Sequence, residues 1–445
     1  MKPKSLLHLC CAGLALASCS PLWAATDLVQ SYELAKENDA DLLTARAAAD
    51  AAIEAKPLAL SQMLPSVTAS ASFFDNRLDT ITKINSRYDE YPSQSIALTL
   101  RQPIFRPALI YSYRQAQAQV RGVDSELANA EQEGILRLAS AYFQVSQARF
   151  ELSATLSQID ALEIQLDGAK ASFTAGIGVR TDIDDVQARL DLVRAKKLQA
   201  EQRLDLAGIV LKNIVGEGGG DTLDLSAERM QLQMVGSMSL DDWLDKARSN
   251  NPALAAAREK VAIADNETKK AFAGRFPSVD GVIQQVKSKS DNITNPDYQY
   301  TNKQIGIQIS VPLYQGGYHL AKERQSLAQL REAQAQEMSA DRRLSALVRE
   351  NYFAVQAGIS RIKALEAAAK SSEEAVYSNS KGIQAGTRSK IELLNAIQAR
   401  AETAMELNRA RIDYVMARLK LLALAGDLDK SDLVEVNGWL VKAAE

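Results

Sequence analysis

The residues best suited to nucleophilic or metal chemistry are few and lie mostly at one end of the chain. Among 445 residues, histidine occurs only at His8 and His319, and cysteine only at Cys10, Cys11 and Cys19. If the N-terminal segment is removed, a Ser-His-Asp triad is possible only through His319, which we expect to be a solvated polar residue. Cysteine-histidine and histidine-rich zinc sites cannot readily form within one chain. The protein is therefore expected to have no catalytic residue, metal or cofactor, or to use carboxylates alone.

The N-terminus has the pattern of an export signal. Two lysines precede a largely apolar stretch, residues 6–17, and small residues follow at Ala24-Ala25. This order predicts a secretory signal peptide over residues 1–24, because the apolar run is shorter than the ~20 residues of a membrane-spanning helix. Leu16-Ala17-Ser18-Cys19 also resembles a bacterial lipobox, in which Cys19 would be the lipidated first residue. Either route exports the chain.

The composition favours long helices over an α/β enzyme. Only 11 residues are proline, with none between Pro107 and Pro252 or after Pro312. Compact domains need turn residues far more often than that. A formal charge of −3 without a lysine or arginine cluster argues against binding to nucleic acid. The chain also lacks the run of about 18 apolar residues that a transmembrane helix needs.

The chain contains one domain-sized unit twice. Leu64-Pro65-Ser66-Val67, for example, corresponds to Phe276-Pro277-Ser278-Val279, 212 residues further on. Such spacing is too long for a solenoid repeat and indicates a duplication. The predicted parts are a first repeat over residues 28–216, a linker over 217–238, a second repeat over 239–426 and a tail over 427–445.

Each copy has the same order of elements: helix, strand, polar loop, strand, long helix, turn and helix. Short segments alternate between apolar and small polar residues, as at Ile305, Ile307 and Ile309. Two polar stretches, Asp75–Ser93 and Ser288–Asn302, are expected to be loops. Helical spacing of apolar residues predicts helices over residues 28–63, 105–175 and 179–215 in the first copy and 240–275, 314–385 and 387–425 in the second.

The alternating strands fit a half-buried soluble sheet or a membrane β-barrel, and export favours the barrel. Each chain offers four strands, whereas a closed membrane barrel needs at least about eight. An open sheet in lipid would leave edge groups unsatisfied, each at a cost of several kcal/mol. One chain therefore cannot form a pore, and two or three copies must combine. A free-standing coiled-coil rod would explain the helices but not the strands.

The order of elements, the duplication and several short motifs resemble the TolC-type outer-membrane factors. The most specific motifs are the two helix-hairpin tips, residues 176–183 and 386–392, and the strand-to-helix turns Pro103-Ile104-Phe105 and Pro312-Leu313-Tyr314. The resemblance implies a mainly α homotrimer with a long periplasmic α-barrel and a small membrane β part, a 12-stranded β-barrel. The linker and the tail would form an equatorial collar.

The resemblance also implies a function. Such proteins are passive exit ducts in the outer-membrane lipid of Gram-negative cells, for type I protein secretion or multidrug efflux. A periplasmic adaptor joins them to an inner-membrane pump of the ABC or RND class. The alternative is a periplasmic coiled-coil adaptor or structural protein, which would need a lipoyl-type or β-barrel domain that the sequence lacks. A carboxylate-only hydrolase is disfavoured, because it would need a globular segment with convergent acids and no segment of this sequence is globular enough.

In this family the hairpin tips form the periplasmic entrance, held shut by ionic links and narrowed by acidic rings. Asp182 and Arg388 match the positions of the latch, while Ile383 stands where the latch often has tyrosine. Glu392 and Asn395 match the pore constriction, although the family usually has aspartate at the second position. The tip residues that would contact the adaptor are Gly176, Gly178, Thr181, Gly386, Thr387 and Ser389.

The same residues also have purely local interpretations. Ser389 with Glu392, and Thr181 with Asp184, have the spacing of a helix capping box. Asp182 in a first helical turn is favourable in any case, because the helix N-terminus carries partial positive charge. Arg388 could be a solvated tip residue. The tip glycines are expected to adopt positive φ, as a helix C-terminus often requires.

Overall fold

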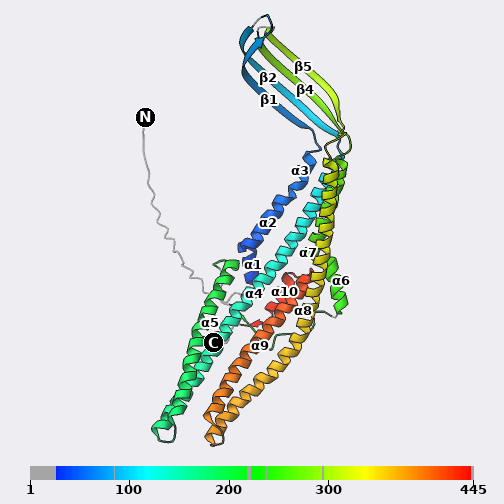
Figure 1. The fold of residues 1–445 in the computed structure, drawn as a ribbon. Coiled ribbons are helices and arrows are strands. Elements are labelled where there is room, and N and C mark those ends of the chain that lie inside the picture. Colours follow the sequence, from blue (N-terminus) through cyan, green and yellow to red (C-terminus); the bar gives the residue numbers. More distant parts are fainter. Residues whose placement is uncertain (1–26, 85, 218–221, 237, 293–294, 442–445) are drawn as a thin grey trace, which may run out of the picture.

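The computed structural model describes residues 27–84, 86–217, 222–236, 238–292 and 295–441. The predicted signal peptide over residues 1–24 and the possible lipidation site Cys19 lie outside these ranges. The described chain is elongated, with a four-stranded sheet at one end and two long helix hairpins that point the other way (Figure 1). The predicted fold class, mainly α with a small β part, is confirmed.

Four helices make the two hairpins and confirm the predicted long elements. Helix α4, Pro107–Thr174, returns as α5, Arg180–Val215. Helix α8, Tyr318–Gln384, returns as α9, Lys390–Leu424. Among the described residues, no helix is both long and apolar enough to cross a membrane.

Shorter helices lie against the upper halves of the two long ones. They are α1 (Leu28–Asn38), α2 (Ala40–Ile53), α3 (Ala55–Ser61), α6 (Leu240–Asn250) and α7 (Pro252–Ala273). Helices α2 and α3 contact α4, and α7 contacts both α4 and α8 (Figure 1). Each long helix therefore has one set of partners near the sheet and another in the hairpin.

The predictions of continuous helices over residues 28–63 and 240–275 were wrong. Asp39 and Asn251 have extended backbones and interrupt them. Each side chain caps the helix that follows, because Asp39 accepts a hydrogen bond from the Asp41 amide and Asn251 one from the Leu254 amide. Proline disfavours helical conformation in the residue before it, which accounts for the break before Pro252.

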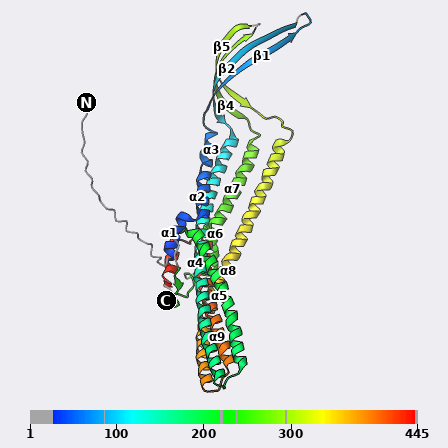
Figure 2. The same ribbon diagram turned by 90° about the vertical axis from the view of Figure 1, so that its left-hand side faces the viewer.

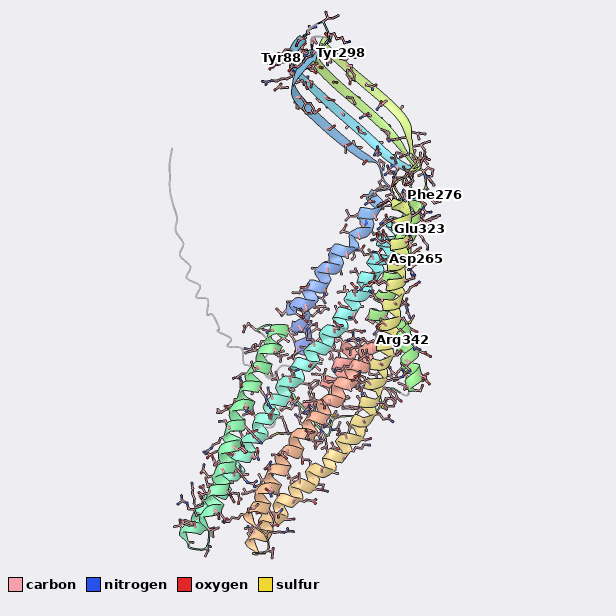
Figure 3. All side chains as sticks on the ribbon, viewed as in Figure 1. Tyr88, Asp265, Phe276, Tyr298, Glu323 and Arg342 are labelled. Atoms are coloured by element: carbon pink, nitrogen blue, oxygen red, sulfur yellow. The ribbon has the colours of Figure 1, made fainter. Side chains whose placement is uncertain are left out.

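The sheet is antiparallel, in the order β1-β2-β4-β5. Its strands are β1 (Ser66–Ile81), β2 (Ser86–Phe105), β4 (Ser278–Asn292) and β5 (Asn295–Ser310). The predicted polar loops, Asp75–Ser93 and Ser288–Asn302, were wrong, because most of their residues continue the strand ladders. Polar side chains do not prevent backbone pairing where both faces of a sheet meet water. The tyrosines Tyr88 and Tyr298 mark this distal end of the sheet (Figure 3).

Near the helices, the sheet has one aliphatic and one polar face. The register aligns Val67, Leu100, Ile283 and Ile305 across the four strands. The next row, on the opposite face, contains Thr68, Thr99, Gln284 and Gln304. This is the alternation read from the sequence, now continuous across all four strands.

A buried ion pair fixes the point where the first copy passes from sheet to helix. The Asp280 side chain is only 5% exposed, and the Arg106 guanidinium binds it with an Nε–Oδ1 distance of 2.7 Å. Arg106 directly precedes α4, and the register of β2 with β4 shifts between Pro103 and Phe105. The sheet bends away from the helix axis at this junction (Figure 2). Removing Arg106 would leave the buried Asp280 carboxylate with only the more distant Arg101, whose Nε lies 3.9 Å away.

Midway along the helices, the linker and the tail pack on the main hydrophobic core. Strand β3, Asp224–Leu225, pairs with β6, Leu440–Val441, which follows α10, Lys430–Asn437. The Tyr142 hydroxyl accepts a hydrogen bond from the Leu223 amide (N–O 2.7 Å), and burial raises the pKa of this hydroxyl. Tyr414 accepts one from the Gln233 amide (3.1 Å). Both repeats thus hold the linker through a buried tyrosine.

The turn after α9 provides a test of this packing. Gly426 has a φ of +75°, and a Cβ there would lie 2.4 Å from the Asn250 carbonyl oxygen. We expect Gly426→Ala to destabilise the fold by about 2–4 kcal/mol, measured as a lower thermal unfolding temperature by circular dichroism. The control is Gly168→Ala. Gly168 is an exposed residue of α4, and a Cβ there would meet no neighbouring atom within 4 Å, so this substitution should stabilise the fold slightly. Equal effects would show that this turn tolerates a side chain.

Candidate functional site: the helix-hairpin tips

Both hairpins turn through a glycine with left-handed backbone. Gly176 has a φ of +73° and Gly386 a φ of +72°, which confirms the expected conformations. Each glycine follows the C-cap of its long helix, where the amide of Ile177 or Thr387 closes the helix end. The returning helices then begin at Arg180 and Lys390, so the two tips have the same geometry (Figure 1).

The two tips differ in what packs inside them. A Cβ at Gly178 would lie 2.9 Å from the backbone nitrogen of Phe173, so the first tip has no room for a side chain. The corresponding residue of the second tip is Arg388, whose side chain lies over Gly382. A Cβ at Gly382 would come within 2.4 Å of Arg388 Cγ. In the sequence, the only signal at Gly382 is its place near the end of a helix.

Arg388 and Glu392 are held within the second hairpin. Arg388 Nη1 lies 3.4 Å from Glu392 Oε1. Glu392 also accepts a hydrogen bond from the Ser389 amide (3.1 Å), while Ser389 Oγ accepts one from the Glu392 amide (3.3 Å). The capping-box interpretation of Ser389 and Glu392 is therefore confirmed. Arg388 therefore partly balances the charge of Glu392.

The corresponding capping box at Thr181 and Asp184 was wrong. Helix α5 begins at Arg180 with Val179 as its N-cap, and no side chain caps it. Thr181 already lies inside the first turn, where its hydroxyl cannot serve as an N-cap acceptor. Asp184 instead lies 3.9 Å from Arg180 Nε in an exposed pair.

Two polar contacts join the hairpins to each other. Lys390 Nζ lies 3.2 Å from Asp182 Oδ2, and Arg189 Nη2 donates a hydrogen bond to Asn395 Oδ1 at 3.0 Å. Both contacts connect α5 with α9. Within the described part of the chain, Asp182 pairs with Lys390 and no ion pair joins it to Arg388. The roles of Lys390 and Arg189 could not be predicted, because nothing in their local sequence shows which helix lies opposite.

An apolar contact lies beside these polar ones. Leu394 on α9 is 3% exposed and packs into the core of the first hairpin. The residues around it come from α4 and α5: Ile159, Leu162, Leu166, Val186, Leu190 and Val193. The second hairpin therefore inserts one leucine into the first at the level of the Asp182 and Arg189 contacts.

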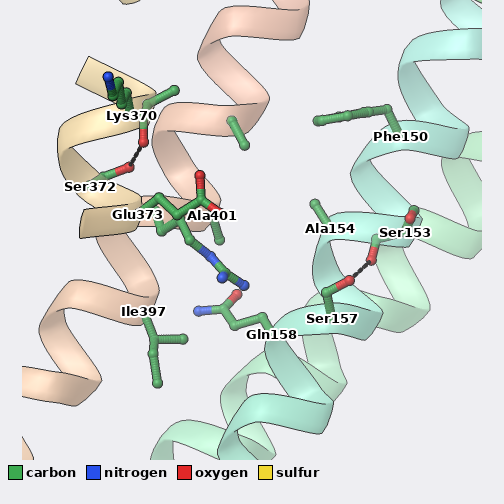
Figure 4. Close-up of a pocket in the computed structure, with 13 residues that line it drawn as sticks. Phe150, Ser153, Ala154, Ser157, Gln158, Lys370, Ser372, Glu373, Ile397 and Ala401 are labelled. Atoms are coloured by element: carbon green, nitrogen blue, oxygen red, sulfur yellow. Dashed lines mark hydrogen bonds between the residues drawn. The ribbon is translucent and has the colours of Figure 1, made fainter. Parts of the chain in front are cut away.

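Above the tips, a cavity of about 490 Å³ opens between α4 and the pair α8/α9 (Figure 4). Its lining mixes apolar residues such as Phe150 and Ile397 with the polar side chains of Gln158, Lys370 and Arg400. In the described ranges, no group of three or more histidine, cysteine, aspartate or glutamate residues is placed to hold a metal ion.

His319 lies far from the tips, near the sheet. Its ring packs beside Gly274 and against Tyr318, and its Nε2 atom is buried. The residue as a whole is half-buried, so the expectation of a solvated side chain is met only in part. The ring approaches α7 closely, because Gly274 has no side chain of its own.

Comparison with known proteins gives one consistent result. A family model described as "Outer membrane efflux protein" matches residues 31–217 and 243–427. The chain is 30% identical over 424 residues to the outer membrane protein TolC of Vibrio cholerae, covering 95% of each chain. It is also 30% identical over 416 residues to the alkaline protease secretion protein AprF of Pseudomonas aeruginosa, covering 92% of this chain and 86% of AprF.

Solved structures agree in fold. The outer membrane protein VceC of Vibrio cholerae superposes with a TM-score of 0.74 at 16% identity, covering 90% of this chain and 96% of VceC. The CmeC outer membrane channel of Campylobacter jejuni gives 0.77 at 14% identity, covering 98% of each. Because the family model matches both repeats and TolC of Vibrio cholerae aligns over nearly the whole chain, the protein belongs to the outer membrane efflux protein family.

Proposed function

We propose that three copies of this chain form a passive, gated duct through which an inner-membrane pump exports its cargo. The family places the protein in the cell outer membrane, with most of its helical mass in the periplasm, as an exit channel for efflux or secretion. The single observation that carries the assembly is the open four-stranded sheet, which requires more than one copy, and the resemblance to TolC-type outer-membrane factors favours three copies over two. The duct would perform no chemistry of its own.

Strands β1 and β5 form the two edges of the sheet and lack a partner on one side. In lipid, each unsatisfied backbone group costs several kcal/mol, so the edges must pair with other copies. Three chains would close a barrel of 12 strands, with the aliphatic face outward and the polar face lining the passage. Exposed apolar residues on α5 and α8, such as Leu192, Leu198 and Phe353, support lateral packing of the copies below the sheet.

Below the membrane, the linker over 217–238 and the tail over 427–445 would form the equatorial collar. The pairing of β3 with β6 supports this, because it joins the two segments on the outside of the helical core. The domains that we propose are therefore the same as those predicted from the sequence: two repeats, the linker and the tail.

The partners are proposed from the family and from the chemistry of the tips. AprF and the proteases secretion protein PrtF of Dickeya chrysanthemi are secretion proteins by name, which favours type I protein secretion with an ABC pump. Multidrug efflux with an RND pump is the second candidate, supported by the name of the family. A periplasmic adaptor would contact the hairpin tips at Gly176, Gly178, Thr181, Gly386, Thr387 and Ser389.

The gate would lie at the same tips. Asp182 and Arg388 are proposed as the latch, and Glu392 and Asn395 as the constriction. The contacts between hairpins support a closed entrance, since Asp182 binds Lys390 and Leu394 inserts into the first hairpin. Opening would require α9 to move away from α5, with the energy supplied by the pump.

The assembly is tested by native mass spectrometry of the detergent-purified protein. We expect a species of three mature chains, because four strands cannot close a barrel and three chains of the TolC type would give 12 strands. The denatured mass would also show whether the chain begins after Ala24 or at a lipidated Cys19. A stable monomer would rule out the duct and restore the coiled-coil adaptor.

The latch is tested by single-channel conductance in planar bilayers. Asp182→Asn should raise the conductance, because it removes the ion pair that joins the two hairpins, and Arg388→Ser should raise it as the other half of the proposed latch. The control is Arg180→Ser, which removes an equally cationic tip residue whose ion pair with Asp184 lies within α5 and joins no second helix. Conductance and voltage dependence unchanged from wild type would refute the latch assignment.

The apolar contact is tested with Leu394→Ala. Truncating a buried leucine costs about 2–5 kcal/mol, so the second hairpin should separate from the first more readily. We expect a larger fraction of open channels and faster hydrogen exchange in α4 around Leu162. The control, Ile391→Ala, truncates a side chain that is 50% exposed and should leave both measurements unchanged. Identical behaviour of the two variants would mean that Leu394 does not hold the hairpins together.

A further inference from the structure

Several cations at the tips are paired with carboxylates, whereas Arg189 is not. Three ion pairs balance the neighbouring cations: Arg180 with Asp184, Lys390 with Asp182 and Arg388 with Glu392. Arg189, in contrast, donates to the neutral amide oxygen of Asn395. No acid of the described chain lies within ion-pair distance of its guanidinium, and this includes Asp185, one turn earlier on α5. Its guanidinium is therefore oriented by a neutral amide rather than by a carboxylate.

Asn395 belongs to a stripe on α9 that faces water. Glu392, Asn395, Ala399 and Glu402 are exposed and follow one another at helical spacing of three or four residues. The buried residues of this segment, Leu394 and Ile397, point elsewhere. In the proposed duct, the exposed stripe lines the entrance. The inference below rests on that proposed function.

We infer that Arg189, held in place by Asn395, forms a cationic ring at the periplasmic entrance that binds anions. An arginine keeps its charge at any physiological pH, and its planar fork suits sulfate, phosphate and carboxylate oxygens. An amide acceptor fixes the guanidinium and leaves its remaining donors free. Asn395 is thus a positioning residue, and Arg189 is the residue that meets the passing ion or an acidic segment of the cargo.

The ring would change which ions enter. In bulk water, one unit charge about 8 Å from a permeating ion changes the local concentration of that ion about two-fold. Three copies act together at the entrance, and their effect grows where the channel wall excludes water. Glu392 opposes them only in part, because Arg388 balances it within each copy.

The experiment measures reversal potentials of the trimer in planar bilayers under a KCl gradient. Arg189→Gln should lower the anion-to-cation permeability ratio by about two-fold or more. Sodium sulfate added on the periplasmic side should reduce the wild-type current but not the Arg189→Gln current. The charge-matched control is Arg180→Gln, which removes one cation from the first turn of the same helix and should retain wild-type selectivity and sulfate block.

Variants of Asn395 test whether the ring that selects ions is formed by Arg189 or by the amide of Asn395. Asn395→Asp alone should reduce anion preference, because the new carboxylate pairs with Arg189. The double variant Arg189→Gln/Asn395→Asp should become cation-selective and be blocked by hexaamminecobalt(III), whereas Asn395→Asp alone should resist this block. If Arg189→Gln matches wild type in both selectivity and sulfate block, the cationic ring is refuted and the duct stands. If wild-type protein forms no channels, the duct itself is refuted.

Discussion

The structure depends on one constraint, the need of every strand edge in lipid for a hydrogen-bonding partner. The sheet ends at β1 and β5, and each edge offers a row of unpaired amide and carbonyl groups. Because a bilayer provides no water to satisfy them, the edges must meet other copies of the chain. The same closure would bring the long helices of the copies side by side. The hairpin tips would then surround one axis and could act as a single gate.

The duplicated chain uses two different joints between sheet and helix. In the first copy, β2 runs directly into α4, and the buried pair of Arg106 with Asp280 fixes the joint. In the second copy, residues 311–317 separate β5 from α8, and Gly316 and Gly317 both have positive φ. Asp280 lies on β4, so the acid that neutralises the first joint comes from the second repeat. The two copies are therefore bound to each other at the point where the sheet bends.

Much of this architecture could be read from the sequence, because periodic patterns report local structure. The aliphatic alternation at Ile305, Ile307 and Ile309 predicted one face of the sheet, and the long stretches without proline predicted the long helices. The polar stretch Asp75–Ser93 was wrongly predicted to be a loop, because the backbones of two strands can pair without apolar side chains. Pro252 signals a helix break, whereas Asp39 breaks the first copy without such a signal. The contact of Arg189 with Asn395 joins residues 206 positions apart, and no local pattern could predict it.

In the proposed duct, the tips would separate mechanical hold from ion choice. The hold comes from contacts that are satisfied on both sides: Leu394 in an apolar core, and Asp182 with Lys390. Such contacts can break and reform without changing the net charge that faces the passage. Ion choice would come from Arg189, because its partner Asn395 orients the guanidinium without adding a negative charge. Asparagine in place of an aspartate at this position thus does more than weaken an acidic ring, since it lets the arginine opposite set the sign of the charge.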